Sequence, residues 1–96
     1  MNSLDALADP TRRRIVELLA LEERSAGEIA SLFPTSRPGV SRHLRVLRDA
    51  GLVRVREEGP RRLYSLDPAP LEELTAWLGN RLDALDTEIR RRRRKR

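Results

Sequence analysis

The stretch from Ser36 to Leu66, SRPGVSRHLRVLRDAGLVRVREEGPRRLYSL, decides the fold of this 96-residue chain. Its first half, through Ala50, combines apolar residues at helical spacing with several arginines, and Gly51 supplies a helix stop. Its second half contains two β-prone runs joined by the turn at residues 57–60. A basic helix followed by a basic hairpin presents two elements that fit the grooves and the backbone of duplex DNA.

The helix predicted over residues 37–50 has an apolar face and a polar face. At 100° per residue, the apolar face comprises Val40, Leu44 and Leu47. The opposite face comprises Pro38, Arg42, Arg45 and Asp49, with Ser41 at its edge. Gly39 weakens this helix by about 0.5–1 kcal/mol relative to alanine, so it either permits close approach to DNA or has no role.

Shorter helices are expected before this one. A first turn or helix is predicted around Leu4 and Leu7, and a second helix runs from the cap Asp9-Pro10 to about Leu21. Residues 22–24 are expected to form a turn.

A capping box at Ser25–Glu28 begins a third helix. This helix is expected to bury Ile29 together with Leu32 or Phe33, and to end at Pro34. Two short helices at this spacing, the second one amphipathic and basic, predict a helix-turn-helix. With the hairpin as its wing, the fold class is mainly α with a small β-hairpin (α+β), a winged helix-turn-helix.

A long helix is predicted after residues 67–70, DPAP. Its apolar residues recur every three to four positions, at Leu71, Leu74, Leu78, Leu82, Leu85 and Ile89. No other segment remains to cover this stripe, so a second copy of the chain is the expected cover. We therefore expect one domain over residues 1–89 and a basic tail over residues 90–96, whose end is disordered because like charges repel.

The net charge of +5 is unevenly distributed. Residues 37–62 hold eight arginines against three acids, whereas residues 63–89 hold one arginine against six acids, and the last seven residues are all basic. A basic block of this kind implies a directed contact with a polyanion.

Several classes of function are disfavoured by what the sequence lacks. It has no cysteine, which excludes disulfides and thiolate metal sites, and it has no apolar run long enough to span a bilayer and no signal peptide. A cytoplasmic protein is therefore expected, without cofactor and without membrane contact. Catalysis is not expected either, because the one histidine, His43, lies on the presumed DNA-facing helix and no glycine-rich phosphate loop or carboxylate cluster with metal spacing appears.

Three segments in order, LADPTRRRIVELL (residues 7–19), SAGEIA (25–30) and the stretch from Ser36 to Leu66, resemble the ArsR/SmtB family of bacterial winged-helix repressors. The resemblance covers roughly residues 4–78, and its strongest part is VSRHLRVLRDAGLV (40–53) with the hairpin that follows. It implies a homodimer formed through the first and last helices, and repression by occupation of a double-stranded DNA operator. Many members release the operator when an effector binds; the identity of any small-molecule effector here stays open.

The resemblance does not extend to the family's metal sites. The thiolate-sensing branch has a Cys-x-Cys pair where this chain has Ser25 and Gly27. The branch that binds zinc through its last helices pairs aspartate and histidine across the dimer, but here that helix has no histidine and only acids such as Asp83 and Asp86. No transition-metal site is expected, and the chain is closest to the non-metal branch.

The expected DNA contacts come from the basic helix and from the wing. They are Ser36, Arg37, Ser41, Arg42, His43, Arg45, Arg61 and Arg62. Arg42 and Arg45 suit guanine in the major groove or its flanking phosphates, and the helix start suits a phosphate. For His43 the family position suggests a DNA contact, and the alternative is a half-buried spacer. Arg54 and Arg56 are expected to face solvent.

The expected dimer interface comprises Leu4, Leu7, Leu71, Leu74, Leu78, Leu82 and Leu85. Trp77 is expected to pack in that interface or in the core, and an effector pocket around it is the less favoured alternative.

The predicted function is a sequence-specific, homodimeric, operator-binding repressor. The alternative is nonspecific binding of RNA or DNA driven by the arginine tail. The aromatic residues Phe33, Tyr64 and Trp77 all fit core positions, so no base-stacking platform for RNA is predicted.

Overall fold

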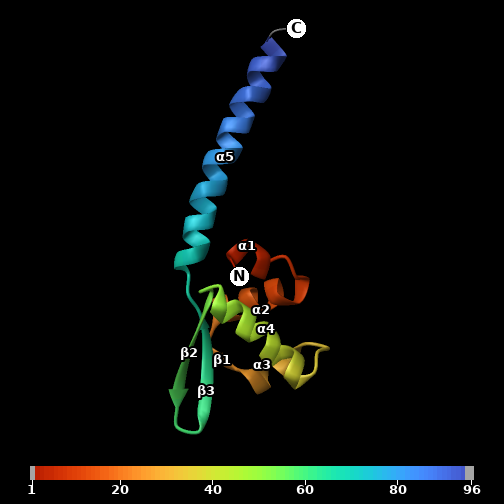
Figure 1. The fold of residues 1–96 in the computed structure, drawn as a ribbon, viewed down its shortest axis with the longest axis vertical. Coiled ribbons are helices and arrows are strands. Elements are labelled where there is room, and N and C mark those ends of the chain that lie inside the picture. Colours follow the sequence, from red (N-terminus) through yellow and green to blue (C-terminus); the bar gives the residue numbers. More distant parts are fainter. Residues whose placement is uncertain (1, 95–96) are drawn as a thin grey trace.

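The computed structural model describes residues 2–94. In chain order the elements are α1 (Ser3–Ala6), α2 (Pro10–Leu21), β1 (Arg24–Ser25), α3 (Ala26–Leu32), α4 (Arg37–Asp49), β2 (Val53–Glu58), β3 (Arg61–Leu66) and α5 (Ala69–Arg94). Helices α1 to α4 and the small sheet form one body, from which α5 projects (Figure 1). The predicted fold class, mainly helical with a small antiparallel sheet, is confirmed.

Side-chain caps fix the starts of the three helices around the basic block. A carboxylate oxygen of Asp9 accepts from the Arg12 amide at 3.0 Å at the start of α2. Ser25 and Glu28 each accept from the other's backbone amide at 3.2 Å, which confirms the predicted capping box of α3. The Ser36 hydroxyl accepts from the Gly39 amide at 3.2 Å at the start of α4. A cap of this kind contributes about 1 kcal/mol.

The end of α4 is a Schellman turn at Gly51. Gly51 has a φ of +77° and donates to the Arg48 carbonyl at 2.9 Å, while Leu52 donates to the Leu47 carbonyl at 3.0 Å. Only glycine adopts this left-handed conformation without strain. The turn leads the chain directly into β2 and so fixes the direction of the wing relative to α4.

The sheet is antiparallel, with strand order β1-β3-β2. Strands β2 and β3 pair from Val53 opposite Leu66 to Glu58 opposite Arg61, and Gly59 (φ +58°) and Pro60 form the loop between them. The expected turn at residues 22–24 is wrong in part, because Arg24 pairs with Tyr64 to form β1. Strand β1 has only two residues, too few to show the alternating apolar pattern by which a strand is predicted. It forms because β3, far along the chain, offers an edge to pair with.

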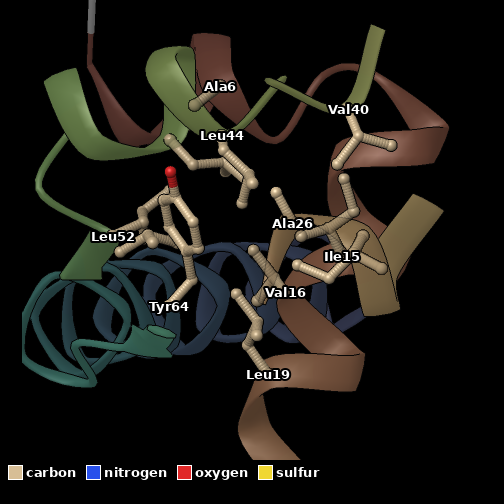
Figure 2. Packing of buried hydrophobic residues seen from close by; sticks show 12 residues of the cluster. Ala6, Ile15, Val16, Leu19, Ala26, Val40, Leu44, Leu52 and Tyr64 are labelled. Carbon is tan, nitrogen blue, oxygen red and sulfur yellow. The ribbon is translucent and has the colours of Figure 1, made fainter. Parts of the chain in front are cut away.

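The core joins α1 to α4 with the first residues of the wing. Its fully buried large side chains are Ile15, Ile29, Val40, Leu44, Leu47 and Leu52. Tyr64 of β3 packs into the same cluster as the side chains of α2 and α4 (Figure 2). The predicted apolar face of α4 is therefore confirmed. At the end of α3, Phe33 packs against the core whereas Leu32 is exposed.

Helix α5 projects well beyond this core. Its 26 residues span about 39 Å, and none of them is buried. The Cα radius of gyration is 17.6 Å, against about 12–13 Å expected for a compact chain of this length. Apart from Leu71, which packs against the core, the apolar residues of α5 therefore have no partner in the core that residues 2–94 form.

The helix also continues across residue 90 to Arg94, where a separate tail was expected. Ion pairs one turn apart join Asp86 to Arg90 at 3.0 Å and Glu88 to Arg91 at 3.4 Å, and cations near a helix C-terminus interact favourably with the helix dipole. The part of the expected disorder that concerns residues 95–96 lies outside the described residues.

Candidate nucleic-acid interface

The polar face of α4 presents two unpaired arginines. Arg42 and Arg45 are exposed, and neither forms an ion pair with any residue in the described range 2–94. Because Val40, Leu44 and Leu47 anchor the opposite face in the core, this side of the helix points outward. A rigid helix with two available guanidinium groups has the geometry needed to approach base edges or phosphates.

The start of α4 lies against the start of α3. The Ser36 hydroxyl is already used as the helix cap, although the residue is exposed. A Cβ added at Gly27 would lie 3.3 Å from Nη1 of Arg37, which places the Arg37 guanidinium over α3. Ser41 is exposed one turn further along α4.

Gly39 has a structural reason within the chain. A Cβ added there would lie 2.7 Å from Cγ2 of Thr35 and 3.3 Å from the Ser36 hydroxyl. The absence of a side chain therefore accommodates the turn that precedes α4, which gives this glycine a role without any appeal to DNA.

His43 lies on the other edge of α4, half-buried near the start of α2. Its Nδ1 is buried and has no hydrogen-bond partner among the described residues. The pKa of Asp9 is lowered mainly by the hydrogen bond from the Arg12 amide, with a further electrostatic contribution from His43. This position agrees with the spacer alternative, and a DNA contact by His43 stays a prediction.

Ion pairs tie the wing to the rest of the body. Arg56 of β2 makes two hydrogen bonds to the Glu23 carboxylate, at 2.9 and 2.7 Å, and Arg61 of β3 pairs with Glu28. The hydrogen bond from Arg56 lowers the pKa of Glu23, and the pKa of Glu28 is lowered first by the Ser25 amide and also by Arg61. We call these two contacts, Arg56–Glu23 and Arg61–Glu28, the wing anchors.

The wing anchors refine the sequence-based expectations for the wing. Arg54 and Arg56 are exposed as predicted, but both are engaged, since Arg54 pairs with Asp67 at 3.0 Å. Of the two predicted wing contacts, Arg61 is held by Glu28, whereas Arg62 is exposed and has no ion pair within the described chain. Sequence reasoning missed Glu23 and Glu28 as wing supports because their partners lie 33 residues away.

A hollow of about 410 Å³ lies between the starts of α3 and α4 and strand β3. Its lining residues with polar side chains are Ser25, Arg37, Ser41, Arg61, Arg62 and Tyr64, and Gly27 also lines it. It thus brings together predicted contacts from α4 and from the wing. Arg42, Arg45 and His43 do not line it.

The residues of the expected dimer interface fall into two groups. Leu4, Leu78, Leu82 and Leu85 are exposed, each by 47% or more, whereas Leu7, Leu71 and Leu74 are half-buried. Leu7 and Leu71 pack against the chain's own core as well. Trp77 is 52% exposed with the Arg81 guanidinium 5.3 Å from its ring centre, so the core position expected for Trp77 is wrong.

The described part of the chain contains neither a metal-binding cluster nor a membrane-spanning helix. Between residues 2 and 94, no group of three or more His, Cys, Asp or Glu side chains is arranged to hold a metal ion. Within the same range no helix is long and apolar enough to cross a membrane.

Helices α3 and α4, joined by a short turn and followed by the β2–β3 hairpin, define a winged helix-turn-helix DNA-binding protein. Residues 7–56 match the family model described as a helix-turn-helix domain. The chain belongs to the ArsR/SmtB family of transcriptional regulators.

The sequence is 34% identical over 88 residues to the transcriptional repressor SdpR of Bacillus subtilis (strain 168), covering 92% of this chain and 98% of SdpR. It is 55% identical over 69 residues to the HTH-type transcriptional regulator Rv2034 of Mycobacterium tuberculosis, covering 72% of this chain but only 64% of that relative's length.

Solved structures agree with this assignment. A possible transcriptional regulator for arsenical resistance has a TM-score of 0.76 at 42% identity, covering 92% of this chain and 96% of that one. An ArsR-like regulator from Rhodococcus sp. RHA1 has a TM-score of 0.84 at 29% identity, covering 90% and 79%. A homodimeric winged helix-turn-helix domain from Mycobacterium bovis has a TM-score of 0.67 at 33% identity, covering 82% and 73%.

Proposed function

We propose that this regulator is a homodimeric repressor that occupies a palindromic operator through α4 and the wing. The observation that carries the proposal is the convergence of cationic side chains from both elements. Arg37 and Ser41 of α4 and Arg61 and Arg62 of β3 line one hollow, and Arg42 and Arg45 are unpaired on the adjacent outer face of α4. Helix and wing therefore face a common surface, as contact with one duplex requires.

The exposed leucine stripe of α5 supports the dimeric form. Leu78, Leu82 and Leu85 lie on one face of a helix that contributes no buried residue. An apolar face of this length in water is stabilised by pairing with a second copy. A similar structure from Mycobacterium bovis is homodimeric, and the named relative SdpR is a repressor.

Selection of bound duplexes from a random DNA pool tests the proposal. The expected outcome is a roughly palindromic sequence whose half-sites are about 34–36 Å, or one helical turn, apart. Repeating the selection at two salt concentrations separates base reading from phosphate attraction. Recovery of no preferred sequence at either concentration would contradict the proposal.

Nonspecific binding by the arginine-rich end of α5 is the competing proposal. The C-terminal end of α5 and the tip of the wing lie at opposite ends of the molecule (Figure 1). Because of this separation, we do not expect the arginine-rich end to be the main contact of a duplex that lies against α4. Deletion of residues 90–96 is expected to leave the operator preference intact, and loss of all binding would instead favour the competing proposal.

A further inference from the structure

The hollow between α3, α4 and β3 has the size of a ligand site. It measures about 410 Å³, which lies within the range of roughly 300–1,000 Å³ typical of small-molecule sites. Three separate segments form it: residues 25–27, the first turns of α4, and the start of β3. A hollow of this volume is large enough for a small-molecule ligand.

The lining selects for an anion. Three arginines line the hollow: Arg37, Arg61 and Arg62. Glu28 neutralises Arg61, whereas Arg37 and Arg62 have no hydrogen bond or ion pair to another side chain within residues 2–94. Two uncompensated arginines beside two serine hydroxyls match the donor pattern that a tetrahedral phosphate group accepts, often with bidentate arginine contacts.

Gly27 leaves room for one of these donors, and Glu28 holds another. Gly27 has no side chain where the Arg37 guanidinium lies, at 3.3 Å from the position of a Cβ. Glu28 closes the capping box of α3 with Ser25 and also holds Arg61. A site whose side chains are already positioned loses less conformational entropy on binding.

We propose that this hollow binds a phosphate group, and that a free phosphate-bearing small molecule occupies it in competition with the operator's backbone. The inference rests on the proposed function for its second half, because Arg37, Ser41 and Arg62 are also proposed DNA contacts. The phosphate group bound in the hollow can then come from either of two sources, the DNA phosphodiester or the free molecule. Occupation by the free molecule lowers operator affinity, which makes the hollow a regulatory site.

Direct binding to the full chain tests the first half. Inorganic phosphate and pyrophosphate are titrated at constant ionic strength, with chloride as the balancing anion, while the amide NMR signals of Gly27 and Ser41 are followed. Saturable shifts are expected, with pyrophosphate the tighter ligand. Arg37→Gln and Arg62→Gln are each expected to weaken binding roughly tenfold or more.

Arg48→Gln is the matched control, since Arg48 is exposed on the same helix but does not line the hollow. The control variant is expected to bind pyrophosphate as the unmodified chain does. Absence of saturation, or an equal loss in Arg48→Gln, would overturn the inference by showing diffuse attraction only.

Operator titrations at increasing pyrophosphate test the second half. The apparent operator Kd is expected to rise linearly with the pyrophosphate concentration once that concentration exceeds the Kd for pyrophosphate, beyond the effect of chloride at equal ionic strength. Operator binding that does not respond to pyrophosphate would overturn the inference and leave the proposed function standing. Pyrophosphate binding by a chain that binds no duplex would overturn the proposed function and leave the phosphate site standing.

Discussion

Single residues on α4 divide its surface into a face that packs in the core, an exposed outer face that we propose contacts DNA, and two edges. Arg42 and Arg45 occupy the outer face, Arg37 and Ser41 the edge toward the wing, and His43 the edge toward α2. The helical periodicity of 3.6 residues produces this division from the sequence alone. Each position can therefore be tested separately.

Arg42→Ala is expected to weaken operator binding by about 1–3 kcal/mol and to relax specificity at one base position, because bidentate reading of a guanine is lost. The measurement is a set of binding isotherms on the operator and on its single-base variants. Arg48→Ala, which removes the same charge from another exposed position of α4, is the control. If the loss of affinity were equal on every sequence, and the salt dependence of binding corresponded to about one phosphate contact fewer, Arg42 would be a contact to the DNA backbone.

Gly39→Ala is expected to destabilise the fold despite the higher helix propensity of alanine. The new Cβ would lie 2.7 Å from Cγ2 of Thr35, and relieving this contact shifts the turn before α4. In a Thr35→Ala background the 2.7 Å contact is absent and only the 3.3 Å approach to the Ser36 hydroxyl remains, so the same substitution is expected to destabilise much less or to stabilise by up to about 0.5–1 kcal/mol. Denaturant unfolding of the four proteins in this double-mutant cycle measures the coupling. Additive effects would contradict the steric explanation.

The wing is the element whose position depends most on long-range contacts. Its strands form a hairpin in which only Val53, Leu63 and Tyr64 are buried. Packing against the core therefore holds only one end of the hairpin. The wing anchors add two arginine–glutamate contacts nearer the tip. Such exposed ion pairs contribute little to global stability, but they tie the hairpin to Glu23 and Glu28.

Acid is expected to release these anchors. Because the pKa values of Glu23 and Glu28 are lowered in the folded chain from the ordinary 4.5, their contribution to stability is complete above about pH 4.5 and is lost as the pH falls through the lowered values. The melting temperature is therefore expected to be level near neutral pH and to fall in this acid range. The measurement is circular dichroism melting at closely spaced pH values.

Glu28→Gln keeps an acceptor for the Ser25 amide but removes the charge that faces Arg61. Its melting temperature is expected to fall less steeply below pH 4.5 than that of the unmodified chain. Glu57→Gln is the control, because Glu57 is exposed on the wing and forms no ion pair with the described residues. Identical acid profiles for Glu28→Gln and the unmodified chain would contradict the role of this anchor.

Local patterns predicted most of the elements, and long-range contacts account for what was missed. The capping box at Ser25, the apolar face of α4 and the stop at Gly51 are local signals, readable within a few residues. Strand β1 and the wing anchors depend on residues 33 or more positions apart, which no local pattern encodes. The hollow could not be predicted either, because its walls come from three segments that meet only in the fold.

The whole molecule is elongated. A compact body carries a helix that makes the longest dimension 65 Å while the other two are 25 and 23 Å. The apolar residues of that helix recur at the helical period, so together they form a straight, continuous face. Exposed apolar stripes of this kind mark protein interfaces.

Leu78→Asp combined with Leu82→Asp is expected to convert the dimer into a monomer, because each variant carboxylate would be buried without a partner in the paired stripe. Sedimentation equilibrium measures this change. Trp77, the only tryptophan, is half-exposed beside the stripe, so the unmodified chain is expected to show a blue-shifted emission as its concentration rises and the double variant is not. None of the buried core residues belongs to α5, and Leu71, the one residue of α5 that packs against them, is kept, so the double variant is expected to stay folded.

Operator binding is expected to follow the oligomeric state. A monomer binds one half-site, so the advantage of engaging two half-sites together, typically about 10²–10⁴-fold, is lost in the double variant. Asn80→Asp adds a carboxylate to the exposed opposite side of α5 and is expected to remain a dimer with nearly unchanged affinity. If the double variant still sedimented as a dimer, the subunits would have to meet through a surface other than the α5 stripe, and the half-site spacing inferred from that pairing would lose its basis.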